Sequence, residues 1–174
     1  KILSLLGPKD LAISLSTTSF TIVASIQLFA LFMLWSPSKI VFELPFEFLI
    51  YILPILYCLS WFLLIVATID AGLEVQSGAL GWISVLARNK PKFPELPTTG
   101  LYKIIRHPIY ASFFLAVLTV PTWTADQIVV SMILGGYCIF APILKDRRLI
   151  ERHGEKYLRY KNTTPYMLPS KIIK

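Results

Sequence analysis

The feature that most constrains this chain is a set of four long stretches without charged side chains, over residues 11–35, 48–69, 109–125 and 127–144. A helix needs about 20 mainly apolar residues to cross the hydrocarbon core of a bilayer. The chain is 55% hydrophobic and only 16% charged, whereas a soluble domain carries about a quarter charged residues. The sequence therefore predicts an all-α integral membrane protein with about four transmembrane helices. It argues against a soluble enzyme and against a disordered chain.

The third and fourth stretches are separated only by Asp126, which predicts a C-terminal helical hairpin with a tight outer turn. The more polar segments between and after the stretches are predicted to be a cytoplasmic loop at 70–108 and a cytoplasmic tail at 145–174. The whole chain, 1–174, is then a single membrane domain. Its two cysteines have neither the spacing of a metal site nor that of a redox motif, so no metal is predicted.

The net charge of +7 comes from 17 basic and 10 acidic residues. In a soluble chain such an excess would indicate nucleic acid, but in a membrane chain its distribution sets the orientation. If both termini are cytoplasmic, 16 of the 17 basic residues lie on the cytoplasmic side. We therefore predict cytoplasmic termini, with the lipid bilayer rather than nucleic acid as the partner.

The cytoplasmic loop has two parts. Residues 75–87 are moderately apolar, and Trp82 could anchor a helix in the interface plane. Residues 91–97 contain three prolines, which exclude a regular helix. This second part is equally well interpreted as a plain connector or as a lid over a site at the membrane surface.

Two polar clusters flank the predicted hairpin on its cytoplasmic side. Arg106 and His107 precede the third stretch, where the backbone N–H groups of a helix N-terminus add to the Arg charge and favour an anion. The tail after the fourth stretch is predicted to be an amphipathic helix, and one of its faces carries, at helical spacing, Asp146, His153, Tyr157 and Tyr160. Because a hairpin brings its ends together, the two clusters should face each other and suit a zwitterionic ligand.

Simpler interpretations of both clusters remain open. Arg106 and His107 could be a juxtamembrane charge anchor. The basic residues on the other face of the tail helix could only contact anionic lipid headgroups. The hairpin favours a binding site because it brings the two clusters close together in space.

The ordered pair of motifs around the hairpin resembles a family of membrane methyltransferases. The first motif is Arg-His-Pro-x-Tyr at 106–110, and the second places an acidic residue, a Leu and Gly-x-x-Tyr-x-x-Tyr within 146–160. This pattern is similar to isoprenylcysteine carboxyl methyltransferase, phospholipid N-methyltransferases, NnrU-like proteins and methanethiol S-methyltransferase. Residues 97–169 look nearest to the methanethiol and NnrU-like branch.

The resemblance implies S-adenosylmethionine at the cytoplasmic end of the hairpin and a small or lipophilic thiol, carboxylate or amine as the methyl acceptor. By the same resemblance the cofactor pocket is lined by Arg106, His107 and Tyr110, faced by Asp146, and closed by Tyr157 and Tyr160. A general base is needed only if the acceptor must lose a proton. His107 and His153 are the candidates for that catalytic role.

Two positions depart from the family pattern. Arg147 follows Asp146 where the family usually has a second carboxylate, and Ser112 stands where a glycine is frequent. The alternative hypothesis is therefore a non-catalytic, methyltransferase-like structural or assembly subunit of a larger respiratory or photosynthetic membrane complex, with other membrane subunits as partners. A sterol-reductase-like enzyme fits less well, because that family is typically much longer.

Overall fold

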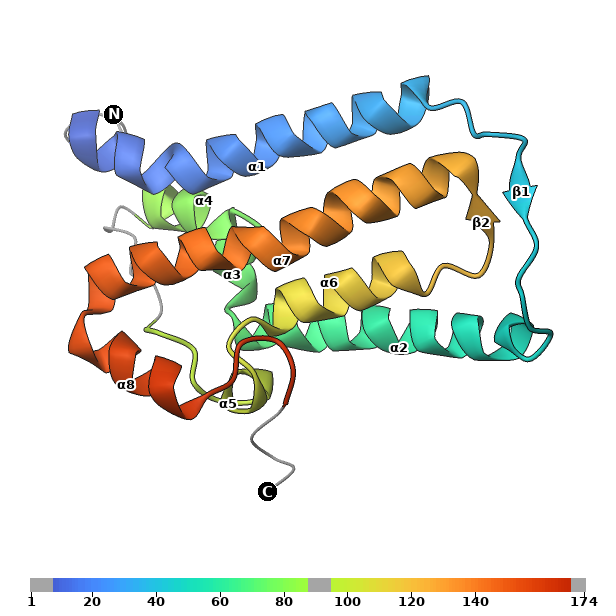
Figure 1. The fold of residues 1–174 in the computed structure, drawn as a ribbon. Helices are drawn as coiled ribbons and strands as arrows, with labels where there is room; N and C mark the ends of the chain where they lie inside the picture. The colour runs from blue at the N-terminus through green and yellow to red at the C-terminus, as the bar shows by residue number, and fades with distance from the viewer. Residues whose placement is uncertain (1–7, 88–94, 170–174) are drawn as a thin grey trace. The chain divides into compact units, whose positions relative to one another are not determined.

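A computed structural model describes residues 8–87 and 95–169 and shows a mostly helical chain (Figure 1). The helices are α1 (Pro8–Leu34), α2 (Leu49–Asp70), α3 (Leu73–Gln76), α4 (Ala79–Leu86), α5 (Leu101–Ile104), α6 (Pro108–Leu118), α7 (Ala125–His153) and α8 (Glu155–Thr163). Two short strands, β1 (Val41–Phe42) and β2 (Trp123–Thr124), pair in antiparallel fashion, with Val41 opposite Thr124. Apart from this ladder, the all-α prediction is confirmed.

The chain divides into two compact units, residues 1–36 with 71–95 and residues 37–70 with 96–174. In the first unit α1 packs against α4, which lies where an interfacial helix is predicted and carries an exposed Trp82. The proline-rich segment 91–97, interpreted above as either a connector or a lid, lies mostly outside the described residues.

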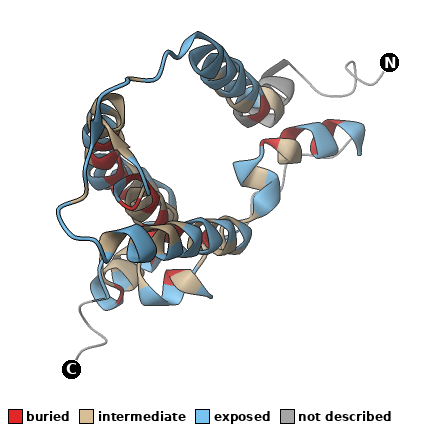
Figure 2. Cartoon of the chain, turned by 90° about the vertical axis from the view of Figure 1, so that its right-hand side faces the viewer, coloured by how far each residue is buried: buried red, intermediate tan, exposed pale blue. Residues whose placement is uncertain are grey.

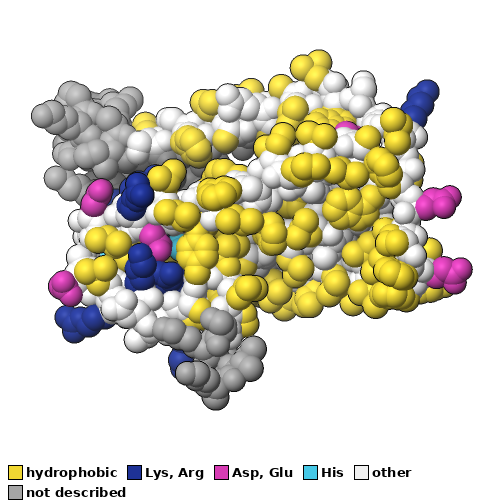
Figure 3. All heavy atoms as spheres, in the orientation of Figure 1, with side chains coloured by type: hydrophobic (Ala, Val, Ile, Leu, Met, Phe, Trp, Pro, Cys, Tyr) yellow, Lys and Arg dark blue, Asp and Glu magenta, His cyan; other side chains and the backbone are white. Residues whose placement is uncertain are grey.

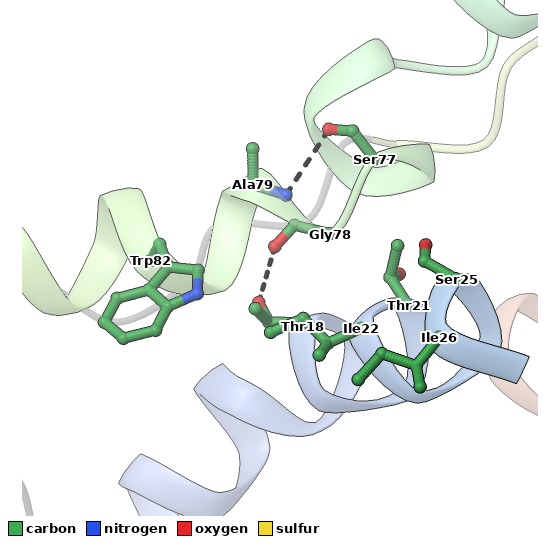
Figure 4. A pocket seen from close by; sticks show the side chains of 9 residues that line it. All are labelled: Thr18, Thr21, Ile22, Ser25, Ile26, Ser77, Gly78, Ala79 and Trp82. Atoms are coloured by element: carbon green, nitrogen blue, oxygen red, sulfur yellow. Dashed lines mark hydrogen bonds between the residues drawn. The ribbon is translucent and has the colours of Figure 1, made fainter. Parts of the chain in front are cut away.

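The contact between α1 and α4 depends on a glycine. Gly78 precedes α4 with φ of 75°, and the Thr18 hydroxyl donates a hydrogen bond to its carbonyl. A Cβ at Gly78 would lie 2.9 Å from the Thr21 hydroxyl oxygen, so only glycine allows this approach. A cavity of about 310 Å³ lies beside this contact (Figure 4). It is lined by Thr18, Thr21, Ile22, Ser25, Ile26, Ser77, Gly78, Ala79 and Trp82, none of which is titratable.

In the second unit α6 packs along α2 on one side and along α7 on the other. The packing of α6 against α7 agrees with the predicted hairpin of the third and fourth stretches. Its turn is fixed by the β1–β2 pair and by Thr124, the N-cap of α7, whose hydroxyl accepts from the Gln127 N–H at 3.3 Å. The far ends of α2, α6 and α7 meet α5 and α8, where the polar clusters lie (Figure 1).

Among the residues that the structure describes, two helices, α2 and α7, are long and apolar enough to cross a membrane. In the apolar 18-residue part of each helix, only 6% of the residues of α2 and 22% of those of α7 are buried. The core helix of a soluble protein is mostly buried. Most of the helix surface is exposed (Figure 2), and hydrophobic side chains cover α2, α6 and α7 along most of their length (Figure 3). Lys and Arg side chains gather at the end where α8 lies (Figure 3).

The four-span prediction is not confirmed in full. The third stretch is helical only to Leu118, and 11 residues span about 16 Å, half of the roughly 30 Å hydrocarbon core. Pro121 explains the early end, because a proline disfavours helical geometry at the residue before it. Helix α1 has 27 residues, and its part Thr18–Leu34 is apolar.

The tail differs from the single amphipathic helix predicted for it. Helix α7 continues past Leu144 to His153, and Gly154, with φ of 52° and ψ of −129°, separates it from α8. This backbone geometry is one that glycine adopts readily and other residues rarely do. The turn at Gly154 changes the direction of the chain, so His153 and Tyr157 do not share one continuous helical face.

Candidate functional site

Asp146 is the centre of a cluster of polar side chains in the second unit. Its Oδ1 atom lies 2.8 Å from His107 Nε2 and also accepts a hydrogen bond from the Tyr157 hydroxyl. Its Oδ2 atom lies 3.1 Å from Arg106 Nη1 and 3.8 Å from Lys161 Nζ. The Asp146 side chain is only 8% exposed. A buried carboxylate of this kind needs such partners, because an unpaired buried charge is very costly.

The hairpin is the reason that these residues meet. Pro108 occupies the first turn of α6, a position where its missing N–H costs nothing, so α6 starts directly after Arg106 and His107. Helix α7 runs back along α6 and brings Asp146 to the same end. The prediction that the two clusters face each other is confirmed by the contacts of Arg106 and His107 with Asp146.

His107 is held in its neutral form. Its side chain is 2% exposed, and burial lowers the pKa of His107 below its ordinary value despite the opposing effect of the Asp146 carboxylate. A neutral imidazole has one N–H, and the contact with Asp146 assigns it to Nε2. The lone pair is then on Nδ1.

The tyrosines of α8 close the cluster from the other side. Tyr157 is 1% exposed, and burial together with its hydrogen bond to Asp146 raises the pKa of its hydroxyl. The Tyr160 hydroxyl donates to the Tyr102 carbonyl at 2.5 Å, and burial raises the pKa of Tyr160 to about 12. Both side chains are therefore protonated hydrogen-bond donors at neutral pH.

The other predicted site residues lie at different distances from this centre. Tyr110 flanks the cluster, with its ring centroid 6.1 Å from that of His107 and its face toward the Lys145 ammonium. The side chain of His153, half-buried at the end of α7, has no hydrogen bond or ion pair with any residue that the structure describes. The structure thus brings together Arg106, His107, Tyr110, Asp146, Tyr157 and Tyr160, and it leaves His153 outside.

The two residues that depart from the family pattern are not among the described hydrogen-bond and ion-pair partners of the Asp146 carboxylate. Arg147 is exposed and makes no ion pair within the described part of the chain. Ser112 is 5% exposed, buried within α6.

Sequence reasoning missed two members of the cluster, Lys161 and Tyr166. Lys161 approaches Asp146 from the second turn of α8. Tyr166 follows α8, and its ring lies 5.6 Å from the Arg106 guanidinium and 5.1 Å from the His107 ring. The available signal was the pair of prolines at 165 and 169, which indicates a chain that folds back instead of continuing a helix.

A second contact supports the loop before Arg106. The Asp70 carboxylate, at the end of α2, accepts a hydrogen bond from the Leu101 N–H at 2.8 Å. Gly100 has φ of 57°, and a Cβ there would lie 2.1 Å from Asp70 Oδ2. Glycine at this position therefore lets the loop rest directly on α2.

The cluster combines the Arg106 guanidinium, which can bind an anion, with the Asp146 carboxylate, which can bind a cation or accept a hydrogen bond from a hydroxyl. Arg106 Nε is buried and has no hydrogen-bond partner among the described residues, so the guanidinium keeps an unused donor. Asp146 provides the opposite charge a few ångströms away. This pairing can hold a ligand that carries both a carboxylate and an amino or hydroxyl group.

Comparisons with known proteins point to one kind of enzyme. The chain is 29% identical over 153 residues to the methanethiol S-methyltransferase of Pseudomonas deceptionensis, covering 87% of this chain and 58% of that protein. It is 26% identical over 153 residues to methanethiol S-methyltransferase 1 of Bradyrhizobium diazoefficiens, covering 87% and 54%. A shorter match to methanethiol S-methyltransferase 2 of the same organism has 33% identity over 72 residues, 41% of this chain and 28% of that protein.

These relatives confirm the resemblance to membrane methyltransferases. The chain spans little more than half the length of the first two relatives. No protein-family model matches it, and no solved structure does.

Proposed function

We propose that this chain acts in an S-adenosylmethionine-dependent membrane methyltransferase whose acceptor is a small thiol. The observation that carries the proposal is the buried Asp146 cluster, built from both motifs of the resemblance and placed at one end of an apolar hairpin. The names of the relatives support a thiol rather than a carboxylate or an amine as the acceptor.

The residues present fit the chemical groups of S-adenosylmethionine. The unused Nε donor of Arg106 suits a carboxylate, and Asp146 suits an amino or ribose group. Tyr110, Tyr157 and Tyr160 would provide the walls of the pocket. When bound, the cofactor supplies a methyl group carried on a positively charged sulfur.

The chain's own residues contribute alignment and exclusion of water. Methyl transfer is an in-line displacement, so holding the reactants in a dry, fixed geometry accounts for most of the catalysis. A thiol acceptor must also lose its proton, because the thiolate is the nucleophile. In His107 the lone pair on Nδ1 is the candidate base, since Nε2 donates to Asp146.

The departures from the family pattern are compatible with this function. Arg147 is exposed, and the Asp146 carboxylate keeps its partners. The membrane setting completes the proposal: both termini are cytoplasmic, the exposed apolar sides of α2 and α7 contact lipid, and a lipophilic acceptor enters from the bilayer.

Titration of the purified protein with S-adenosylhomocysteine, followed by calorimetry in detergent, tests the proposal. The wild-type chain should bind, and the variants Arg106→Ala and Asp146→Asn should bind at least tenfold more weakly. Arg147→Ala and Glu151→Gln are matched controls, because each removes the same charge from an exposed position of α7. No binding at millimolar ligand, or equal losses in the controls, would refute the proposal.

A second candidate function has one observation in its favour. Asp146 already has four partners, so its carboxylate is satisfied without a ligand, as it would be in a purely structural ion-pair network. A non-catalytic assembly subunit would purify with a larger membrane complex and would not bind S-adenosylhomocysteine. The same titration therefore separates the two functions.

A further inference from the structure

The charged centre of the site is covered. The side chains of Arg106, His107 and Asp146 are 9%, 2% and 8% exposed. A ligand with the size of a nucleoside cannot touch all three unless some covering segment moves. Two segments of the second unit provide contacts over the cluster, helix α8 and residues 164–168 that follow it.

Helix α8 is the firmly attached cover. Tyr157 is almost fully buried and bonded to Asp146, and the Tyr160 hydroxyl is bonded to the backbone of α5. Moving α8 would break these contacts and leave the Asp146 carboxylate short of a donor. Such a movement is expensive, because buried polar groups that lose their partners pay the full cost of desolvation.

The segment after α8 is attached mainly through backbone hydrogen bonds and the Tyr166 side chain. The Arg106 N–H donates to the Pro165 carbonyl at 2.9 Å, and the His107 N–H donates to the Tyr166 carbonyl at 3.3 Å. The segment has no helix or strand of its own, and Leu168 is 76% exposed. Segments without regular secondary structure open at a lower cost in free energy than the helices that they cover.

Tyr166 is the residue that connects this segment to the site. Its ring lies over the Arg106 guanidinium at 5.6 Å and edge-on to the His107 ring at 5.1 Å. Its hydroxyl donates to the Ile139 carbonyl of α7 at 2.8 Å. Pro142 lies three residues further along α7, and a proline inside a helix opens the preceding turn, which suits a backbone carbonyl that accepts a bond from outside the helix.

We propose that residues 164–168 form a latch, in which Tyr166 is the positioning residue that holds Arg106 under cover and must swing away before a ligand carboxylate can reach it. Opening breaks two backbone bonds and the bond to Ile139, and it uncovers the guanidinium. Closing restores these bonds over the ligand. The identity of the ligand rests on the proposed function, whereas the latch itself rests only on the contacts of Tyr166.

Hydrogen exchange of the full chain, followed by mass spectrometry in detergent, tests the latch without any ligand. The Arg106 and His107 amides report its opening directly, since both donate to it. Tyr166→Phe removes only the bond to Ile139 and should speed exchange at these two amides about fivefold, as expected for one hydrogen bond. Tyr166→Leu also removes the ring contacts and should speed it further.

Matched controls keep this test specific. Tyr51→Phe and Tyr51→Leu make the same changes at an exposed position of α2 and should leave the exchange unaltered. The Gly154 amide, bonded within the α7–α8 turn, should keep its protection in every variant. Unchanged exchange in Tyr166→Phe, or equal acceleration at Gly154, would overturn the latch.

A kinetic measurement then tests its role as a gate. Stopped-flow fluorescence with S-adenosylhomocysteine should show faster association in Tyr166→Phe by about the factor seen in exchange. Tyr166→Leu should also release the ligand faster. Faster exchange with an unchanged association rate would overturn the gate. If the wild-type chain binds no S-adenosylhomocysteine, the proposed function fails, and the exchange result still decides whether the latch exists.

Discussion

The two ends of the α6–α7 hairpin solve the same packing problem with different chemistry. At the turn, the Ser131 hydroxyl donates to the Val117 carbonyl at 3.0 Å and accepts from the Gln127 side chain at 3.1 Å. At the opposite end, Asp146 binds Arg106 and His107, which lie about 40 residues earlier in the chain. Neutral hydrogen bonds hold the turn end, here called the neutral end, and an ion-pair cluster holds the opposite end, here called the charged end.

This difference teaches that the charged end does more than hold the hairpin together. Buried ion pairs frequently stabilise a protein no better than apolar residues of the same volume, because both charges must be desolvated. Clusters of buried titratable groups are instead typical of functional sites. The following predictions are ordered from the largest expected effect to the smallest.

Removing Asp146 should have the largest effect. Asp146→Ala leaves Arg106 and His107 buried without their acceptor, and breaking a buried ion pair costs about 3–5 kcal/mol. The midpoint of thermal unfolding in detergent should fall strongly. Glu151→Ala, on an exposed face of the same helix, should change the stability by less than about 0.5 kcal/mol. Similar losses in both variants would remove the contrast between the two ends.

Two glycines of the second unit, Gly100 in the loop before Arg106 and Gly136 within α7, offer the same substitution in two environments. Gly100→Ala forces a side chain onto a positive φ of 57° and into contact with Asp70, which should cost about 2–3 kcal/mol. Gly136→Ala, in α7, meets nothing within 4 Å and should be neutral or stabilising by up to about 1 kcal/mol. Chemical unfolding of both variants measures the difference, and a tolerated alanine at 100 would contradict the loop geometry.

Acidification should weaken the charged end. The pKa of His107 is lowered by burial, so as the pH falls below about 6.5 the unfolded chain takes up a proton before the folded one does. Stability is therefore complete above pH 6.5 and decreases below it, by at most about 1.4 kcal/mol per pH unit. Unfolding midpoints at pH 7.5 and 5.5 should show this loss. It should disappear in His107→Gln and persist in His153→Gln.

The neutral end should give the smallest effect. Ser131→Ala removes a donor to the Val117 carbonyl and an acceptor for Gln127, and a neutral hydrogen bond contributes about 1 kcal/mol. Thermal unfolding should show a small decrease, and S-adenosylhomocysteine binding should be unchanged. A loss as large as that of Asp146→Ala would mean that both ends carry equal weight.

Much of the site could be predicted from the spacing of residues within single segments of the sequence. Arg106 and His107 precede a helix, Asp146 follows another, and the short break at Asp126 joins them into a hairpin. These features depend on local sequence, so the meeting of the two clusters was predictable. The pairing of β2 with β1 was less predictable, because Pro121 indicates that the helix ends but not which distant segment the following residues meet.

The sequence by itself determined the apolar helices, the hairpin and the polar residues at its ends, because these depend on runs and spacings of residue types. Only the tertiary structure decided which polar residues touch. The turn at Gly154 leaves His153 outside and brings Tyr157 and Lys161 to Asp146. The chain then folds back so that Tyr166 covers Arg106, 60 positions away. Such contacts arise from the path of the backbone after a turn, and no periodicity in the sequence encodes that path.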